Sequence, residues 1–335
     1  MEHAISTKPF FSIVMPVYNI AKYVGEALDS ISAQTFQSWE CFCIDDGSTD
    51  GSGRLIDGFA STDCRFIPLH TSNHGVSTAR NIGIERCSGD WLLFLDGDDV
   101  LDTSALELLF NHAKSTKCDM LLFGKEEFVT ASWRSSDICG GEGVKIVNIR
   151  DYVPPSIFYK YFWQGCYRRA AFGDLRMDPA ILFNMGEDQV YYVSALLRVN
   201  EVLEITTSLY GYRLRQGSAM HSPRTVEKWH YDFIHYMILF DLIENGGKVF
   251  DKSIPRELAL RLTEGMAEVL IRMSRIERSS LWQELNPVYM KLSRCKLLSC
   301  WIRTTSALYA MSGSFTVFLL LAGFPRFLKR CGLHR

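Results

Sequence analysis

The sequence predicts an α/β protein in which a mostly parallel sheet is flanked by helices, with a helical region at the C-terminal end. Over the first 125 residues, short apolar runs alternate with amphipathic helical patterns, which is typical of βαβ units. Residues 91–95 (WLLFL) are apolar throughout, as expected of a strand that helices cover on both faces. From residue 225 onward the patterns are helical, for example over 257–273.

Each predicted element has its own signal in the sequence. Helices are expected where apolar residues recur every three or four positions, and strands where short apolar runs occur. The predicted strands cover residues 10–15, 41–44, 65–69, 91–95 and 119–123. The predicted helices cover residues 20–34, 52–60, 75–87 and 103–115. The glycines and prolines within residues 130–160 predict an irregular linker or flap there.

Composition and charge exclude some classes of function. The 335 residues are 47% hydrophobic and 22% charged, as in ordinary folded proteins, and the net charge of -2 argues against general nucleic-acid binding. The ten cysteines include no CxxC pair, which favours reduced thiols over a disulfide framework or a zinc site. The first residues, MEHAISTKPF, contain no signal-peptide core. A cytoplasmic protein is therefore expected.

The end of the chain has a pattern of its own. No acidic residue follows Glu284, whereas Lys and Arg recur up to Arg335. Residues 315–324 (FTVFLLLAGF) are apolar but too few to cross a bilayer, which takes about 20 residues. Such a stripe between basic residues can lie in an anionic membrane surface, or it can be a core helix followed by a solvated basic tail. Both alternatives stay open.

The stretch FLDGDDVL, residues 94–101, ends a predicted strand in three carboxylates. Their mutual repulsion disfavours joint ionisation, so a positively charged partner is expected. Asp96 and Asp98 point to the same side of an extended backbone, and Gly97 lets a ligand approach the chain closely. Hard oxygen ligands suit Mg²⁺ or Mn²⁺, which bridge carboxylates to phosphates. The sequence therefore predicts a divalent cation here, with Asp99 beginning the next turn.

Two other polar clusters, PVYN and DDGSTD, also follow predicted strands. Ligands of parallel sheets bind beyond the carboxyl ends of the strands, so we expect these loops and DGDD to share one crevice. Pro16 and Tyr18 are placed to pack against a base or a sugar ring, and the carboxylates of DDGSTD to accept hydrogen bonds from a base or a ribose. Alternatively, DDGSTD is only a capping turn in which Ser48 or Asp50 caps the next helix.

Five stretches together resemble the family 2 glycosyltransferases, which have the Rossmann-like GT-A fold. They are SIVMPVYN, DDGSTDGS, HGVSTARNIGIERCSGDWLLFLDGDD, FNMGEDQVYY and YGYRLRQGS, in the order and rough spacing of that family. The resemblance implies a GT-A domain over 1–224, with a nucleotide-binding half at 9–125 and an acceptor and catalytic half at 126–224. The helical region over 225–335, with its basic tail, lies outside the resemblance.

The resemblance also implies roles on the donor side. The residues implied to bind the donor are Pro16, Val17, Tyr18, Asp45, Asp46, Arg80, Asp96 and Gly97. Arg80 would reach the nucleotide or stay bonded to the loop carboxylates. Asp96 and Asp98 match the DXD element, with Asp96 near the ribose and Asp98 on the Mn²⁺ or Mg²⁺ ion, and His221 matches a further metal ligand of some relatives. A closing loop near 212–222 would contact the diphosphate through Arg213, Arg215 or Ser218.

On the acceptor side, GEDQ supplies the implied base. Asp188 matches the catalytic base of the family, and Glu187 its structural companion next to the acceptor. Trp163 either stacks on the acceptor sugar or is a core aromatic residue. The surrounding WQGCYRR departs from the family, which often has Lys there.

The implied enzyme is an inverting, metal-dependent glycosyltransferase of the hexosyltransferase type. Asp188 would take the proton of the acceptor hydroxyl, and the cation would stabilise the leaving diphosphate. The expected partners are a nucleotide-diphosphate sugar, most simply a UDP-sugar, and a glycan or lipid-linked acceptor. The expected setting is surface-polysaccharide biosynthesis, in the cytoplasm or peripherally at the inner face of the plasma membrane.

Three other functions are compatible with parts of the sequence. A haloacid-dehalogenase-like phosphatase would use Asp96 as nucleophile and Asp98 as acid/base, but its motif normally opens the domain, and here three predicted strands precede it. A nucleotidyltransferase also uses a metal-binding pair of aspartates. A non-catalytic sugar-nucleotide-binding subunit is disfavoured because Asp46, Asp98 and Asp188 are all present.

Overall fold

The computed structural model of this protein describes residues 8–129, 143–149, 161–179 and 186–215. The chain divides into two compact units, Met1–Ser222 and Pro223–Arg335, and every described residue belongs to the first unit. The predicted helical region over 225–335 and the predicted site residues Ser218 and His221 therefore lie outside the described residues.

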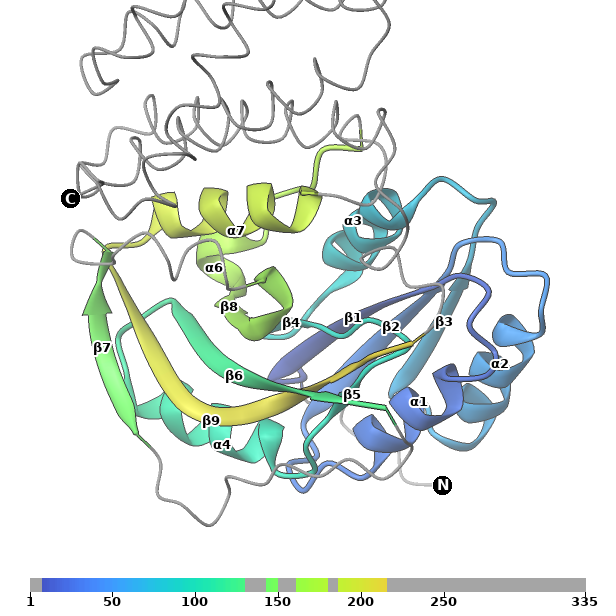
Figure 1. The fold of residues 1–335 in the computed structure, drawn as a ribbon, viewed down its shortest axis with the longest axis horizontal. Coiled ribbons are helices and arrows are strands. Elements are labelled where there is room, and N and C mark those ends of the chain that lie inside the picture. Colours follow the sequence, from blue (N-terminus) through green and yellow to red (C-terminus); the bar gives the residue numbers. More distant parts are fainter. Residues whose placement is uncertain (1–7, 130–142, 150–160, 180–185, 216–335) are drawn as a thin grey trace, which may run out of the picture. The chain divides into compact units, whose positions relative to one another are not determined.

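The described residues form one mixed sheet of nine strands that is flanked by helices (Figure 1). The strands are β1 (Phe11–Val17), β2 (Trp39–Asp45), β3 (Phe66–His70), β4 (Trp91–Phe94), β5 (Val100–Leu101), β6 (Met120–Phe128), β7 (Val144–Asn148), β8 (Gly165–Arg168) and β9 (Glu201–Arg213). The helices are α1 (Val24–Ser32), α2 (Ser52–Thr62), α3 (Val76–Arg86), α4 (Ala105–Ser115), α6 (Arg169–Phe172) and α7 (Glu187–Arg198), and the 3₁₀ helix η3 (Phe162–Gln164) precedes β8.

The strand order is β3-β2-β1-β4-β8-β6-β9-β5, and β7 also pairs with β9. The pairs among β1, β2, β3 and β4 are parallel, as the sequence predicts. β8 lies between β4 and β6 and is antiparallel to both. β9 is parallel to β6 and antiparallel to β5 and β7. The mostly parallel sheet of the prediction is thus parallel on one side and mixed on the other.

The parallel part of the sheet is buried because helices cover both of its faces. Helices α1, α2 and α4 lie on one face and α3, α6 and α7 on the other (Figure 1). Every residue of β1 and β4 is buried, which explains why WLLFL carries no polar alternation. α3 approaches β1 so closely that a Cβ on Gly83 would lie 2.5 Å from Val14 Cγ1. Arg80, one turn earlier in α3, therefore faces the carboxyl ends of the strands.

All nine predicted strands and helices of the first 125 residues are confirmed, with ends that shift by a few residues. The prediction of irregular structure over 130–160 is wrong for residues 144–148, which form β7. The side chains of β7 are mostly exposed, so its sequence shows no buried face, and its hydrogen bonds come from the distant β9. β6 continues past the predicted boundary at 125/126, and the domain boundaries themselves stay predictions.

The described residues also bear on two expectations from composition. The six cysteines among them are all free thiols, and five of the six are buried. None of the helices in these residues is long and apolar enough to cross a membrane.

Candidate active site

The polar loops after β1, β2 and β4 lie against one another. A Cβ on Gly97 would lie 2.7 Å from Ile20 Cδ1 and 3.1 Å from the carbonyl oxygen of Pro16, so the DGDD turn packs directly on the end of β1. The backbone N–H of Asn19 donates to Ser48 Oγ at 3.0 Å, which joins PVYN to DDGSTD. The three clusters therefore meet at the carboxyl ends of the parallel strands, as the sequence predicts.

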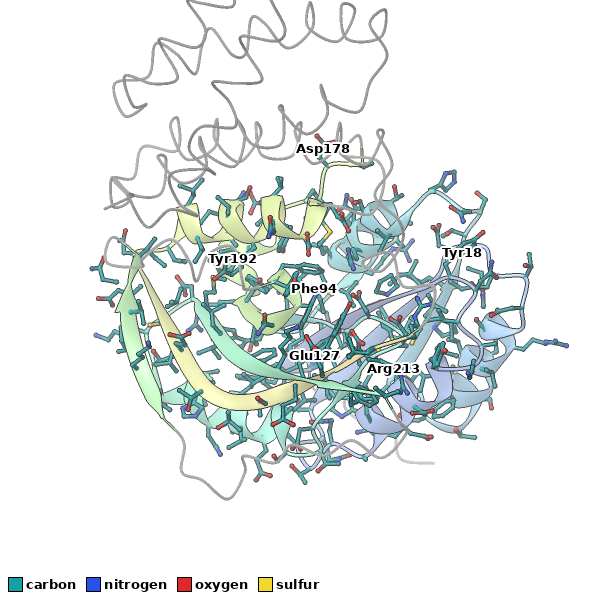
Figure 2. All side chains as sticks on the ribbon, viewed as in Figure 1. Tyr18, Phe94, Glu127, Asp178, Tyr192 and Arg213 are labelled. Atoms are coloured by element: carbon teal, nitrogen blue, oxygen red, sulfur yellow. The ribbon has the colours of Figure 1, made fainter. Side chains whose placement is uncertain are left out.

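At the end of β1, the side chain of Tyr18 is half exposed (50%; Figure 2). Val17 is buried, and its carbonyl oxygen accepts a hydrogen bond of 2.9 Å from the backbone N–H of Asp46. Tyr18 is thus the residue of PVYN that presents a ring to a ligand.

Asp46 is buried and binds the segment that leads into α3. Its Oδ1 accepts hydrogen bonds from His74 N–H at 2.9 Å and from Thr71 Oγ1 at 3.2 Å, and its Oδ2 accepts one from Gly75 N–H at 2.8 Å. A carboxylate has about four lone-pair sites, so one of them stays available for a ligand. The side chain predicted to meet the donor base also orders the loop beside it.

Asp45, the neighbour of Asp46, is also buried, and its side chain forms hydrogen bonds with other segments. Its Oδ1 accepts a hydrogen bond from Ser48 N–H at 2.9 Å, and its Oδ2 lies 2.9 Å from His70 Nδ1. The other ring nitrogen of His70 lies 3.0 Å from Asp57 Oδ1. Hydrogen bonds to Asp45 and then Asp57 raise the pKa of His70, against the opposing effect of burial.

Neither Ser48 nor Asp50 is the N-cap of α2, contrary to the capping alternative for DDGSTD, because the N-cap is Gly51 and it has no side-chain cap. Asp50 Oδ1 accepts hydrogen bonds from the backbone N–H of Ser52 at 3.0 Å and from its Oγ at 2.6 Å, at the start of α2. Asp50 Oδ2 accepts another from Ala21 N–H at 2.8 Å, so the same side chain also holds the loop after β1. Burial opposes ionisation, but these hydrogen bonds outweigh it and lower the pKa of Asp50. The cluster thus joins the loop after β1 to the start of α2.

Asp99 does not begin the next turn, contrary to the prediction. Its backbone N–H closes the DGDD turn on the carbonyl oxygen of Asp96 at 2.9 Å, and its side chain is buried. The carboxyl oxygens of Asp99 accept hydrogen bonds from Tyr210 Oη and Arg213 N–H, both at 2.7 Å. Burial, together with the charges of Asp98 and Asp96, raises the pKa of Asp99. Asp99 therefore anchors β9 to the turn.

Two arginines contact Asp98: Arg213, the last residue of β9, and Arg215, two residues further on. Arg213 Nε donates to the carbonyl oxygen of Asp98 at 2.7 Å, and its Nη2 lies 2.6 Å from Glu26 Oε2 of α1. Arg215 Nε forms an ion pair with the Asp98 carboxylate. Arg213 is a buried strand residue, so the closing loop predicted near 212–222 does not begin before residue 214.

Arg80 connects the DGDD turn to the start of α7. Its Nη2 donates to Asp96 Oδ1 at 2.7 Å, and its Nη1 lies 3.4 Å from Glu187 Oε1. The guanidinium lies over the Phe162 ring, with Cζ 4.6 Å from the ring centroid. Three of the predicted site residues, Arg80, Asp96 and Glu187, are thereby brought together from distant parts of the sequence.

Asp188 is the second residue of α7 and is half-buried. Gly186, at φ 122°, adopts the left-handed conformation that favours glycine and turns the chain into the helix. Burial and the neighbouring charge of Glu187 raise the pKa of Asp188 to about 7, while the N–H of Gln189 and the charge of Arg80 oppose the shift. A carboxylate with this pKa exchanges protons near neutral pH, as a general base requires.

Trp163 is buried in a stack of aromatic rings. Its ring centroid lies 4.3 Å from that of Tyr210 and 4.9 Å from that of Tyr161, and Tyr212 stacks at 5.6 Å. Lys125 Nζ lies 4.8 Å from the centroid of the Tyr212 ring. This packing is that of the core aromatic residue weighed above.

Sequence reasoning missed several residues that build this site. Tyr210 and Glu26 hold the DGDD turn and β9, and Asn81 and Met177 hold the segment before α7. Tyr210 lies in the motif YGYRLRQGS, so its motif gave a signal. Glu26 gave none, because it is one of several polar residues of an amphipathic helix.

Asp96 and Asp98 carry oxygen atoms of the kind that a hard divalent cation prefers. Among the described residues, no three His, Cys, Asp or Glu side chains form a group that could hold a metal ion by themselves. Mg²⁺ and similar ions commonly use one or two carboxylates and complete their shell with water and substrate phosphates. The arginines on both carboxylates show that this position attracts positive charge.

Residues 12–175 match the family model described as "Glycosyl transferase family 2". Among curated relatives, glycosyltransferase GlyA of Streptococcus pneumoniae is 29% identical over 273 residues, which cover 77% of this chain and 38% of that protein. The uncharacterized glycosyltransferase EpsJ of Bacillus subtilis is 29% identical over 239 residues, or 64% of each chain. The chain thus spans less than two thirds of either relative.

Solved structures share the fold. Staphylococcus aureus TarS 1–349 in complex with UDP-GlcNAc superposes with a TM-score of 0.68 at 18% identity, covering 97% of this chain and 92% of that chain. The complex of the same protein with UDP superposes with a TM-score of 0.67. A mannosyltransferase from Pyrobaculum calidifontis in complex with GDP-Man and Mn²⁺ gives 0.50 at 13% identity, over 97% and 88% of the two chains. The fold is the predicted Rossmann-like GT-A fold.

Proposed function

We propose that the protein is an inverting glycosyltransferase that moves a sugar from a nucleotide-diphosphate sugar to an acceptor hydroxyl. The observation that carries the proposal is the Arg80 bridge, which joins Asp96 of the DGDD turn to Glu187 at the start of α7. Asp96, which is expected to serve the donor, is thereby near enough to Asp188, the expected base, for its charge to act on that carboxyl. The family 2 match and the names of the relatives support the same class of enzyme.

The donor is a UDP-sugar in this proposal. Tyr18 and Pro16 would line the nucleotide pocket, and Asp46 would meet the base with the acceptor site that its loop contacts leave available. S. aureus TarS, which shares the fold, was solved with UDP and with UDP-GlcNAc, and this supports a uridine nucleotide. Arg215 would leave Asp98 for the donor diphosphate when the site fills.

Asp96 and Asp98 would hold a divalent cation, Mn²⁺ or Mg²⁺. When bound, such an ion offsets the negative charge that develops on the departing diphosphate. The oxygen ligands of the DGDD turn support this choice of ion, and so does the mannosyltransferase of the same fold solved with Mn²⁺.

Asp188 would act as the base. It would take the proton of the acceptor hydroxyl while that oxygen attacks the anomeric carbon from the face opposite the diphosphate. Its pKa of about 7 lets it accept a proton at neutral pH and release it after the transfer. The half-buried position limits the access of water, which would otherwise compete with the acceptor.

The acceptor is a glycan or a lipid-linked glycan of a surface polysaccharide, and the protein works in the cytoplasm or peripherally at the inner face of the plasma membrane. S. aureus poly(ribitol-phosphate) β-N-acetylglucosaminyltransferase TarS is 25% identical over 222 residues, and its name supports a polymeric acceptor. The basic tail after Glu284 is compatible with contact to anionic lipid.

Two substitutions test the proposal with thermal-shift, calorimetric and transfer assays. Asp98→Ala should abolish the metal-dependent binding of UDP-sugars, whereas Asp188→Asn should bind donor normally and lose transfer. Near-normal turnover by Asp188→Asn would show that the base is another residue. Stabilisation of the protein by vanadate or beryllofluoride alone, with no response to nucleotide sugars, would favour a phosphatase instead.

A further inference from the structure

Arg80 lies between two groups that the proposed function assigns to opposite sides of the reaction. Its two terminal nitrogens contact Asp96, on the donor side, and Glu187, the first residue of the helix that carries Asp188. The side chain is only 4% exposed, and the Phe162 ring covers its guanidinium plane. One rigid charged fork therefore spans the gap between the DGDD turn and α7.

The next residue fastens the approach to α7. Asn81 Nδ2 donates to the carbonyl oxygen of Met177 at 2.7 Å, and the N–H of Met177 donates to Asn81 Oδ1 at 2.9 Å. Met177 Sδ also lies 3.9 Å from Arg80 Nη1. Two consecutive residues of α3 thus hold the chain both ahead of α7 and at its first turn.

This arrangement is costly if its only purpose is stability. Arg80 Nε is buried, and within the described residues it has no hydrogen-bond partner, which leaves a donor unsatisfied. Buried ion pairs are often no more stable than well-packed apolar residues of similar volume. A buried guanidinium that carries this cost and touches carboxylates from two distant segments indicates a functional constraint.

We propose that Arg80 is a positioning residue of the reaction, which fixes the start of α7 against the DGDD turn so that Asp188 faces the donor at reacting distance. This inference rests on the proposed function. Arg80 does not touch the reacting atoms in this scheme; it acts through Asp96 and Glu187. Small errors in such a distance cost transfer rate far more than they cost binding.

The charge of Arg80 has a second effect on the base. It opposes the rise in the pKa of Asp188 that burial and the charge of Glu187 cause. Asp96 acts on the same carboxyl, because its charge also raises the pKa of Asp188. The charge of Asp188 in turn raises the pKa of Tyr161, in the segment before η3. Removal of the positive charge should therefore raise the pKa of Asp188 further.

Three variants separate the effect of the forked guanidinium geometry of Arg80 from the effect of its positive charge. Arg80→Lys keeps the charge but replaces the fork by a single ammonium, Arg80→Gln removes the charge, and Glu187→Gln weakens the same bridge from the other side. Arg168→Lys is the matched control, because Arg168 pairs with Asp119 at 2.7 Å and covers the Trp91 ring at 4.5 Å, outside the site. The measurements are kcat at saturating UDP-sugar, the donor Kd by calorimetry, the pH profile of kcat, and hydrogen–deuterium exchange of the peptide 187–198.

We expect Arg80→Lys to lower kcat by about 100-fold, with a much smaller change in donor Kd. The acid limb of the kcat profile should stay in place for Arg80→Lys and move to higher pH for Arg80→Gln. Exchange within 187–198 should be faster in both Arg80 variants and unchanged in Arg168→Lys.

Several results would overturn the inference. One is a kcat of Arg80→Lys equal to that of wild type. Another is a higher donor Kd of the Arg80 variants with kcat unchanged, which would show that Arg80 only contacts the donor. An unchanged rate of hydrogen–deuterium exchange in the peptide 187–198 of Arg80→Gln would also overturn the inference. If the Arg80 variants do not fold, Glu187→Gln provides the test. It must also lower kcat more than it changes the donor Kd, although by a smaller factor. Failure of the proposed function is recognised separately, by an active Asp188→Asn.

Discussion

The hydroxyl of Tyr210 donates a hydrogen bond of 2.7 Å to Asp99 and accepts one of 3.2 Å from the backbone N–H of Asp96. A residue of β9 thereby holds both ends of the DGDD turn, more than a hundred residues away in the sequence. Because Tyr210 also stacks on Trp163, the geometry of the turn depends on the aromatic core beneath it.

Tyr210→Phe should therefore destabilise the protein and loosen the turn. The variant keeps the ring and its stacking but leaves the buried Asp99 with one hydrogen bond fewer, so we expect a loss of about 1–3 kcal/mol in the free energy of unfolding. Denaturant titration measures this loss, and Tyr18→Phe, at a half-exposed ring, is the control. Equal stability of the two variants would contradict the role of the hydroxyl.

Asp188 should make stability depend on pH in an unusual direction. Its pKa in the folded protein is about 7, above the ordinary value, so the folded state binds the proton more tightly than the unfolded state does. The contribution of Asp188 to stability is then full at acidic pH and falls as the pH rises through about 7. Asp188→Asn removes this dependence. The difference in the free energy of unfolding, variant minus wild type, should therefore be more favourable to the variant at about pH 8.5 than at about pH 5. A gap that is equal at both pH values would show that the carboxyl has an ordinary pKa.

Gly97 should not tolerate a side chain. A Cβ there would meet Ile20, Pro16 and Val17 at 2.7, 3.1 and 3.2 Å, so Gly97→Ala should cost about 1–3 kcal/mol and weaken donor binding. Gly58→Ala in α2 is the matched control, because no atom lies within 4 Å of its Cβ. That control should leave the protein as stable as wild type or stabilise it by up to about 1 kcal/mol. Calorimetric melting of the two variants distinguishes these outcomes.

His70 should contribute stability that is lost on the alkaline side. Its pKa is raised by Asp45 and Asp57, so its contribution is full below the ordinary histidine value of about 6.5 and disappears as the pH rises through the raised value. His70→Gln should therefore destabilise the protein more at about pH 5.5 than at about pH 9. Asp57→Asn, which removes one of the two carboxylates, should show part of this dependence. The same loss at both pH values would rule out a charged imidazole here.

The sequence predicted the parallel half of the sheet because its signals are local. Buried strands such as β4 read as continuous apolar runs, and α1 carries its apolar residues at helical spacing. β8 and β7 had no comparable signal. β8 is only four residues long and is defined by antiparallel pairing with β4 and β6, and β7 exposes most of its side chains.

The site was predictable as far as its motifs reach. DGDD and GEDQ identified Asp96, Asp98 and Asp188 as candidates, and the structure brings the segments that carry them together through Arg80. The sequence leaves a loop carboxylate open as the partner of Arg80, and the structure has Arg80 on Asp96. The pairs Arg80–Glu187 and Glu26–Arg213 were not predictable, since they join positions that are 107 and 187 residues apart. Their pairing depends on tertiary packing, which spacing in one sequence does not record.

The insertion of β8 between β4 and β6 has a consequence for synthesis. While the ribosome is still making residues 129–164, β4 and β6 are already complete but have no strand between them, so both expose unpaired backbone edges. Strands β1 to β4 can pair with one another before β8 exists, but the free edges of β4 and β6 stay open to other chains until residues 165–168 have been made.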